Sequence, residues 1–236
     1  MFTNVRNLIF RLAAGVRRDG PLFMLDLAKR RFVDRASRWA DLHFDWFHGT
    51  ETAGIIETPD LAVASVHKDH GIRYQPTRAR PFRRLMRVLQ IPPGEVFVDI
   101  GSGKGRVLIM ASAFGPKKII GVDYAPELCD IARRNLVSRG RRDSTIATII
   151  HCCDAAEYGF EEGETVIYMF NPFDTVVLDK MLQRLAASLR RAPRKAWLIY
   201  HFPRWNTMIE SQGMFQRLGY YVFEGCEFMV YTHNPD

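Results

Sequence analysis

The feature that most constrains the fold is the segment Val96–Arg106, where an apolar run leads directly into a cluster of glycines. Val96–Ile100 is almost entirely apolar, as a strand covered on both faces of a parallel sheet should be. Glycines follow at once, and the next residues have the apolar spacing of a helix. The turn between them needs glycine because it uses backbone angles closed to other residues and because a Cβ would block the approach of a ligand.

The spacing within this turn separates three kinds of nucleotide-binding loop. A Walker A loop needs GxxxxGK followed by Ser or Thr, but Gly105 follows Lys104 here and Val98 stands where the leading glycine should be. A dinucleotide fingerprint needs a third small residue, and that position is the bulky Arg106. The remaining form, GxGxG with Asp99 two residues before the first glycine, is typical of S-adenosylmethionine-dependent methyltransferases.

Acidic residues stand at the ends of the next two predicted strands. Asp123 ends the second strand, where a carboxylate can accept both ribose hydroxyls of an adenosine. Asp154 follows the third strand and can accept a hydrogen bond from the adenine amino group, while Asp99 can hold the loop backbone or meet the methionine ammonium through water. Each acid alone could be a helix cap or turn residue, but the set predicts S-adenosyl-L-methionine as cofactor. The predicted cofactor-binding residues in and around the loop are Asp99, Gly101, Ser102, Gly103, Gly105, Asp123, Tyr124, Asp154 and Ala155.

From residue 95 onward, short apolar runs alternate with longer helical patterns, which indicates βα units around a parallel sheet. At the end, two β-rich runs are separated by a few residues around Gly225, a link that permits a hairpin but no helical crossover. We therefore predict an α/β, Rossmann-like three-layer sandwich with a mostly parallel seven-stranded sheet ending in an antiparallel β-hairpin. The expected strands are Val96–Ile100, Lys118–Asp123, Ile146–Cys152, Thr165–Phe170, Ala196–His201, Tyr220–Glu224 and Phe228–His233, with helices over 76–89, 104–114, 125–140 and 174–191.

The net charge of +7 lies entirely upstream of the glycine loop, since residues 1–90 carry 16 Lys/Arg and 9 Asp/Glu and residues 91–236 carry 17 of each. This predicts a basic, partly helical N-terminal extension over 1–70 and a methyltransferase domain over 71–236. The basic blocks fit either an anionic partner or solvated helix faces. Residues 1–18 have helical apolar spacing with interspersed arginines, which fits a helix in peripheral contact with a membrane, a targeting segment or a helix packed on the domain.

Composition excludes several classes. The chain has no run of 18 uncharged apolar residues, so no transmembrane helix is expected. Its four cysteines form neither a CxxC pair nor a metal-ligand spacing, and Cys152 and Cys153 fall in what we interpret as a buried strand. We therefore expect reduced thiols, no bound metal and a cytoplasmic protein.

Three motifs carry a family resemblance: Tyr74-Gln75-Pro76-Thr77, Phe97–Arg106 and Asn171-Pro172-Phe173. With them, residues 72–236 resemble the class I methyltransferase superfamily, most closely a bacterial group with YxPT, GSGKGR and NPF motifs. The resemblance extends more distantly to small non-SET protein-lysine methyltransferases. It implies that Tyr74 and Thr77 touch the cofactor by closing over its methionine end. The alternative is that Pro76 and Thr77 merely start a helix.

Asn171-Pro172-Phe173 follows the fourth strand and is similar to the Asn-Pro-Pro-Tyr/Phe element of methyltransferases that act on amino or amide nitrogen. The Asn171 carboxamide and the carbonyl beside Pro172 can accept hydrogen bonds from an N–H nucleophile, while the Phe173 ring covers it. Only one proline is present, which weakens a nucleobase or glutamine acceptor. Asp174 and His201 are the candidate proton acceptors.

The predicted function is therefore S-adenosylmethionine-dependent methyl transfer by in-line displacement to a nitrogen, on a protein lysine or a small amine. One alternative is an RNA methyltransferase that uses the basic N-terminal region, with nucleic acid as partner. The other is a non-catalytic membrane-surface or partner-binding protein with a vestigial cofactor pocket. The sequence leaves the methyl acceptor and the oligomeric state open.

Overall fold

The computed structural model describes residues 36, 39–40, 42–140 and 146–235. The chain divides into two compact units, Met1–His43 and Phe44–Asp236. Residues 1–18, for which the sequence left three interpretations open, lie outside the described residues. All strands described below belong to the second unit.

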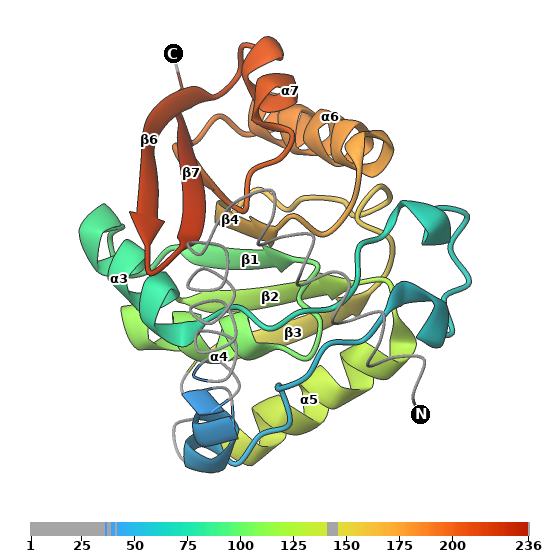
Figure 1. Cartoon of the computed structure of the whole chain (residues 1–236). Helices are drawn as coiled ribbons and strands as arrows, with labels where there is room; N and C mark the ends of the chain where they lie inside the picture. The colour runs from blue at the N-terminus through green and yellow to red at the C-terminus, as the bar shows by residue number, and fades with distance from the viewer. Residues whose placement is uncertain (1–35, 37–38, 41, 141–145, 236) are drawn as a thin grey trace, which may run out of the picture. The chain divides into compact units, whose positions relative to one another are not determined.

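The second unit is built on a seven-stranded sheet with the strand order β3-β2-β1-β4-β5-β7-β6 (Figure 1). β1 to β5 are parallel, β7 runs antiparallel to β5, and β6 pairs with β7 as a hairpin. This confirms the predicted fold class. The strands are β1 (Val96–Ile100), β2 (Lys118–Asp123), β3 (Ala147–Cys152), β4 (Glu164–Phe170), β5 (Ala196–His201), β6 (Gln216–Phe223) and β7 (Cys226–His233).

The central strands β1 and β5 are buried at every position, which explains their continuous apolar sequences. β3 differs because it is an edge strand and has alternately exposed side chains. Cys152 is therefore exposed and Cys153 half-buried, so the interpretation of this segment as a fully buried strand was wrong. The four cysteines are all free thiols.

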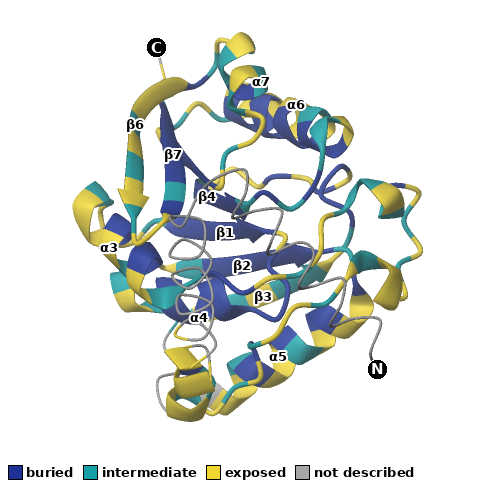
Figure 2. Ribbon diagram, in the orientation of Figure 1, coloured by how far each residue is buried: buried dark blue, intermediate teal, exposed yellow. Residues whose placement is uncertain are grey.

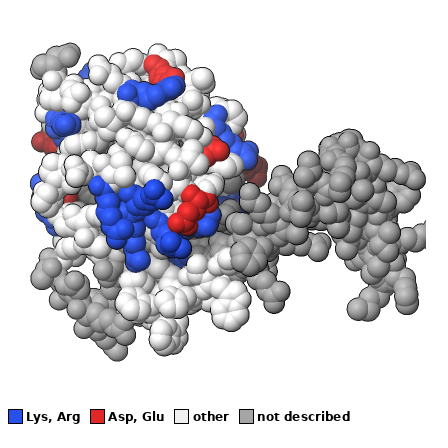
Figure 3. Space-filling view, turned by 60° about the vertical axis from the view of Figure 1, so that its left-hand side comes forward, with Lys and Arg blue, Asp and Glu red and all other residues white. Residues whose placement is uncertain are grey.

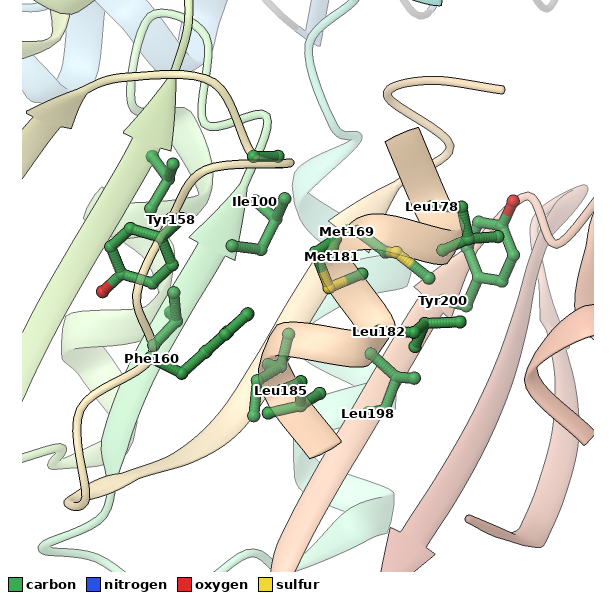
Figure 4. Packing of buried hydrophobic residues seen from close by; sticks show 14 of the residues in the cluster. Ile100, Tyr158, Phe160, Met169, Leu178, Met181, Leu182, Leu185, Leu198 and Tyr200 are labelled. Carbon is green, nitrogen blue, oxygen red and sulfur yellow. The ribbon is translucent and has the colours of Figure 1, made fainter. Parts of the chain in front are cut away.

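Helices cover both faces of the sheet, and their apolar faces form two cores (Figure 2). On one face α6 packs Met181, Leu182 and Leu185 against Leu198 and Ile100 of the strands (Figure 4). On the other face α3 and α4 pack against the opposite side chains of the same strands. The helices are α3 (Ala79–Leu89), α4 (Arg106–Ala111), α5 (Pro126–Gly140), α6 (Thr175–Arg191) and α7 (Asn206–Ser211), with 3-10 turns η1 (Thr58–Asp60), η2 (Lys68–His70) and η3 (Ser112–Phe114).

Because β1 to β5 are parallel, their carboxyl ends meet at one edge of the sheet, which is where α/β folds bind ligands. This edge carries the glycine loop and the acidic residues that the sequence singled out. In the part of the chain that the structure describes, no helix has the length and apolar character needed to cross a membrane.

Candidate cofactor and acceptor site

The glycine loop leaves β1 in a conformation that requires glycine. Gly101, Gly103 and Gly105 have φ angles of 77°, 52° and 82°, in the left-handed region. A Cβ added to Gly101 would lie 2.5 Å from the Pro172 Cβ, and one added to Gly103 would overlap the Tyr74 ring. The loop is therefore held between two motifs that lie about 30 and 70 residues away in sequence, as expected where chain segments approach closely.

Two buried carboxyl groups lie beside this loop. Asp123 accepts hydrogen bonds from the backbone N–H groups of Gly103 at 2.8 Å and Ala125 at 3.0 Å. Burial nevertheless raises the pKa of Asp123 to about 6. Burial, with the neighbouring Asp123, also raises the pKa of Asp99 well above its ordinary value, and no hydrogen bond among the described residues offsets this. Two buried carboxyl groups with raised pKa values favour binding of a cationic ligand, because its positive charge stabilises their ionised forms.

A segment that we name the strap, residues 51–77, covers this edge of the sheet; in Figure 1 it is drawn blue to teal, on the side toward which β1 and β2 point. Its first residue is held on α5, where Glu51 N donates to the Asn135 Oδ1 at 2.8 Å. The end of the strap contacts its beginning. The Tyr74 hydroxyl donates a hydrogen bond to the Thr52 carbonyl at 2.6 Å, and Tyr74 forms an antiparallel β-bridge with Ile56. The Tyr74 ring is thereby fixed over the glycine loop.

The middle of the strap is anchored on Asp154. His67 Nδ1 lies 2.7 Å from the Asp154 carboxylate, which also accepts a hydrogen bond from the Ser65 hydroxyl. The Lys180 Nζ donates to His67 Nε2 at 2.8 Å, so a neutral His67 carries its proton on Nδ1 and donates it to Asp154. Burial acts to raise the pKa of Asp154, but the hydrogen bonds from Ser65, the Ala156 N–H and His67 lower it overall.

Sequence reasoning missed Ser65 and His67. Their only local signal is the run Ser65–His70, which contains two histidines and lies upstream of the helix predicted over 76–89. Asp154 therefore anchors the strap through Ser65 and His67. Its contact with the adenine stays a prediction.

The Asn-Pro-Phe motif closes the other side of the loop. Asn171 has a φ of 37°, a region that few residues other than glycine adopt but that asparagine tolerates. The Tyr200 hydroxyl donates to the Asn171 carboxamide oxygen at 2.8 Å, and Ile72 N donates to the Pro172 carbonyl at 2.9 Å. Phe173 is buried in the core beneath α6. Groups of the chain itself thus donate hydrogen bonds to both predicted acceptor oxygens.

Next to this motif, His70 and Asp174 form a pair. His70 Nδ1 lies 2.7 Å from an Asp174 carboxylate oxygen, and Asp174 N donates to the His70 carbonyl at 3.0 Å. The side chains are 34% and 39% exposed, so solvent and a ligand can reach them. Burial acts to raise the pKa of Asp174, but the hydrogen bonds from His70 and from backbone N–H groups together lower it overall. The sequence identified Asp174 and missed His70.

His201 lies differently from His70. It is buried, stacked between the rings of Phe170 at 3.9 Å and Phe228 at 4.4 Å, and its Nδ1 lies 2.9 Å from the Tyr168 hydroxyl. Burial, reinforced by the nearby Arg78, lowers the pKa of His201 to about 3. It is therefore neutral and packed, and Asp174 with His70 is better placed to accept a proton.

Thr77 lies in the same buried network, with its hydroxyl 3.2 Å from the Tyr168 hydroxyl. The residue that caps α3 is Arg78, without a side-chain hydrogen bond, and the predicted helix begins at Ala79 instead of residue 76. Thr77 is therefore no capping residue. Its predicted contact with a cofactor stays a prediction.

The other predicted cofactor residues form the walls of the site. Ser102 is buried with its hydroxyl against β2, and Tyr124 packs on the strap, where a Cβ on Gly71 would overlap its hydroxyl. Ala155 is buried in the core, and Gly105 packs on α5. All the predicted cofactor positions thus gather at one edge of the sheet.

Together, the strand order, the terminal hairpin and the GxGxG loop with acids at successive strand ends define the class I S-adenosylmethionine-dependent methyltransferase fold. Comparison with known sequences agrees, since residues 97–193 match the family described as "Methyltransferase domain".

Similarity to curated proteins is partial. The chain is 30% identical over 105 residues to a ribosomal protein L11 methyltransferase of Burkholderia multivorans, covering 43% of this chain and 34% of that protein.

Two further relatives methylate lysine according to their names. A histone-lysine N-methyltransferase, H3 lysine-79 specific, of Dictyostelium discoideum is 28% identical over 152 residues, covering 60% of this chain and 8% of the relative. A protein-lysine N-methyltransferase of Saccharolobus islandicus is 30% identical over 70 residues, covering 29% of this chain and 44% of the relative. The chain thus spans less than half the length of each of these relatives.

Solved structures show the same fold at low sequence identity. A SAM-dependent methyltransferase from Aquifex aeolicus superimposes with a TM-score of 0.52 at 15% identity, covering 65% of this chain and 89% of that chain. An RNA methyltransferase from Salinibacter ruber, in complex with S-adenosyl-L-homocysteine, gives 0.50 at 21% identity, covering 69% and 95%.

Proposed function

We propose that this chain is an S-adenosylmethionine-dependent methyltransferase that transfers a methyl group to a nitrogen acceptor. The observation that carries the proposal is the pair of buried carboxyl groups, Asp99 and Asp123, beside the glycine loop. Burial raises the pKa of both, so a ligand with positive charge and hydroxyl donors stabilises their ionised forms. S-adenosylmethionine has an ammonium, a sulfonium and two ribose hydroxyls, which match this donor set.

When bound, the cofactor supplies an electrophilic methyl group on its sulfonium sulfur. In our proposal Asp123 accepts the ribose hydroxyls, and Asp99 faces the methionine ammonium through water. Tyr74 closes over the methionine end, since its ring already rests on Gly103. Asp154 and Ala155 lie on the adenine side.

Asn171 and Pro172 position the acceptor in our proposal. Both border the glycine loop, and Asn171 is joined through Tyr200 to the loop after β5. That loop holds two partly exposed aromatic residues, Phe202 and Trp205, at 40% and 37% exposure. Phe202 has a φ of 55°, and such backbone strain in a residue other than glycine is common at functional sites. Rings there can contact an amine that gains positive charge as it is methylated.

The attacking nitrogen must arrive unprotonated. Removal from water lowers the pKa of an amine, and His70 is placed to take up the proton that is released. Asp174 orients the His70 ring through the 2.7 Å contact with Nδ1, which leaves Nε2 as the accepting atom. Asn171 and the backbone around Pro172 align the nitrogen with the methyl group.

A protein lysine is the first candidate acceptor, because the resemblance to protein-lysine methyltransferases and the names of the three relatives above support protein methylation. A small amine stays as a variant of this proposal. RNA is the second candidate and is favoured by the basic surface of α3.

The test is transfer of a radiolabelled methyl group from S-adenosylmethionine into an extract of cells that lack this protein. We expect labelled product that protease removes if the acceptor is protein, or that ribonuclease removes if it is RNA. Asp123→Ala should abolish labelling, whereas Asp130→Ala, an exposed acid on α5, should not. Absence of labelling with the folded wild-type protein would contradict the proposal.

A further inference from the structure

The exposed side of α3 is a band of arginines. Arg80, Arg84 and Arg87 are exposed and Arg83 is half-buried, and we name these four residues the arginine face. Figure 3 turns this side of the molecule to the viewer and shows Lys and Arg side chains gathered over it. The sequence from residue 78 to residue 94 contains no acidic residue.

The charge of this face is poorly balanced by the protein itself. Glu224, in the turn of the β6–β7 hairpin, is the nearby carboxylate, at 3.6 Å from both Arg78 and Arg80. Among the described residues, Arg83, Arg84 and Arg87 form no ion pair. Burial and, to a smaller extent, the like charge of Arg87 lower the pKa of Arg83. An anionic partner would relieve this repulsion.

The arginine face begins at the acceptor edge of the sheet. Arg78 precedes α3 and donates to the Glu224 carbonyl at 2.7 Å. Thr77, one residue earlier, contacts Tyr168, which contacts His201 at the end of β5. The helix then runs for 11 residues, or about 16 Å at about 1.5 Å per residue. A polyanion that follows α3 therefore ends at the hairpin turn beside the carboxyl end of β5, at the edge of the sheet that carries the proposed acceptor site.

Aromatic rings accompany the arginines. The Arg84 guanidinium lies 4.8 Å from the centre of the Phe223 ring on the hairpin. Arg83 lies 3.5 Å from His48, whose ring contacts that of Phe47, and Phe47 is 58% exposed. Proteins that bind single-stranded nucleic acid combine these two features, because arginines neutralise phosphates and aromatic rings stack with unpaired bases. An acidic peptide would use the charges but has no bases to stack.

We propose that the arginine face binds the phosphate backbone of single-stranded RNA and presents a nitrogen of that RNA to the site beside Asn171. This proposal rests on the proposed methyl-transfer function. Arginine suits this task because its planar guanidinium binds phosphate with two parallel hydrogen bonds. The substrate class is then RNA, the second of the two candidate acceptors, in place of a protein lysine.

The test compares two variants of the full chain that each lose three positive charges. The first is Arg80→Gln with Arg84→Gln and Arg87→Gln. The matched control is Lys117→Gln with Arg134→Gln and Arg190→Gln, exposed residues outside α3. Binding of a fluorescent single-stranded RNA of mixed sequence is measured by anisotropy at salt concentrations from about 0.05 to 0.2 M. The melting temperature and the affinity for S-adenosylhomocysteine show whether each variant is folded.

We expect the α3 variant to bind RNA about 10- to 100-fold more weakly than the wild type at ~0.1 M salt, with its salt slope reduced by about 2. The control should lose less than about threefold. RNA binding that is absent in the wild type, or that is equally weakened in both variants, would overturn the proposal. Equal competition by a polyglutamate peptide of the same charge would overturn it in favour of an acidic protein. RNA binding without any cofactor binding would instead reject the methyltransferase function and leave the docking surface standing.

Discussion

Replacement of Gly101 by alanine tests whether the Asn-Pro-Phe motif rests on the glycine loop. The new Cβ would lie 2.5 Å from the Pro172 Cβ, whereas ordinary contacts begin at 3.4 Å, so Pro172 must move by about 0.9 Å. Two hydrogen bonds oppose this movement of Pro172. Its carbonyl accepts one from Ile72 N at 2.9 Å, and the preceding Asn171 accepts one from the Tyr200 hydroxyl. The expected result is a shift of the acceptor motif away from the loop.

The magnitude follows from two contributions. A residue other than glycine at the φ of 77° costs about 1–2 kcal/mol, and overpacking against a fixed neighbour costs about 1–3 kcal/mol more. Gly213→Ala is the matched control, because Gly213 has a φ of 66° but nothing within 4 Å of an added Cβ. Gly101→Ala should therefore lower the free energy of unfolding by about 2–5 kcal/mol, and the control by only about 1–2 kcal/mol.

The assay is urea unfolding, with the slope checked to be the same in all three proteins. If the two variants are equally destabilised, the clash with Pro172 does not exist and the proposed contact between loop and acceptor motif is wrong. A larger loss for Gly101→Ala, accompanied by a fall in methyl transfer, supports it.

Three further predictions concern the carboxyl group, the asparagine and the histidine of the site. Because the folded-state pKa of Asp123 is raised to about 6, its protonation stabilises the fold at low pH, and this contribution of up to about 3 kcal/mol is lost as pH rises through 6. Asp123→Asn should flatten that part of the curve of unfolding free energy against pH. An unchanged curve would argue against the buried acid. Asn171→Ala should spare cofactor affinity in calorimetry and remove turnover, whereas Asn171→Gly, which keeps the positive φ, should remain folded but equally inactive; unchanged turnover would reduce Asn171 to a turn residue. His70→Gln should lower turnover and flatten the acidic limb of the pH profile while leaving the cofactor affinity intact, and a loss of turnover with an unchanged profile shape would indicate a structural role instead.

Local sequence patterns predicted the glycine loop, because a strand, a positive-φ turn and a helix are each specified by neighbouring residues. The five parallel strands were also predictable, since apolar runs such as Val96–Ile100 and Ala196–His201 suit only strands buried on both faces. The hairpin was predicted, but β6 begins at Gln216 instead of Tyr220, because the register shift between Arg217 and Gly219 lets the strand continue past a glycine.

The strap could not be predicted in the same way. Ser65 and His67 matter because they contact Asp154, 89 and 87 positions away, and His70 matters because it contacts Asp174, 104 positions away. No local periodicity carries such information. The strap belongs to the compact unit that begins at Phe44.

The most direct measurement of the central claim is calorimetric titration of wild type and Asp123→Ala with S-adenosylmethionine and with NAD. We expect the wild type to bind S-adenosylmethionine with a Kd on the order of micromolar, the variant to lose that binding, and neither protein to bind NAD. Tight binding of NAD, or binding of neither compound by the folded wild-type protein, would contradict it.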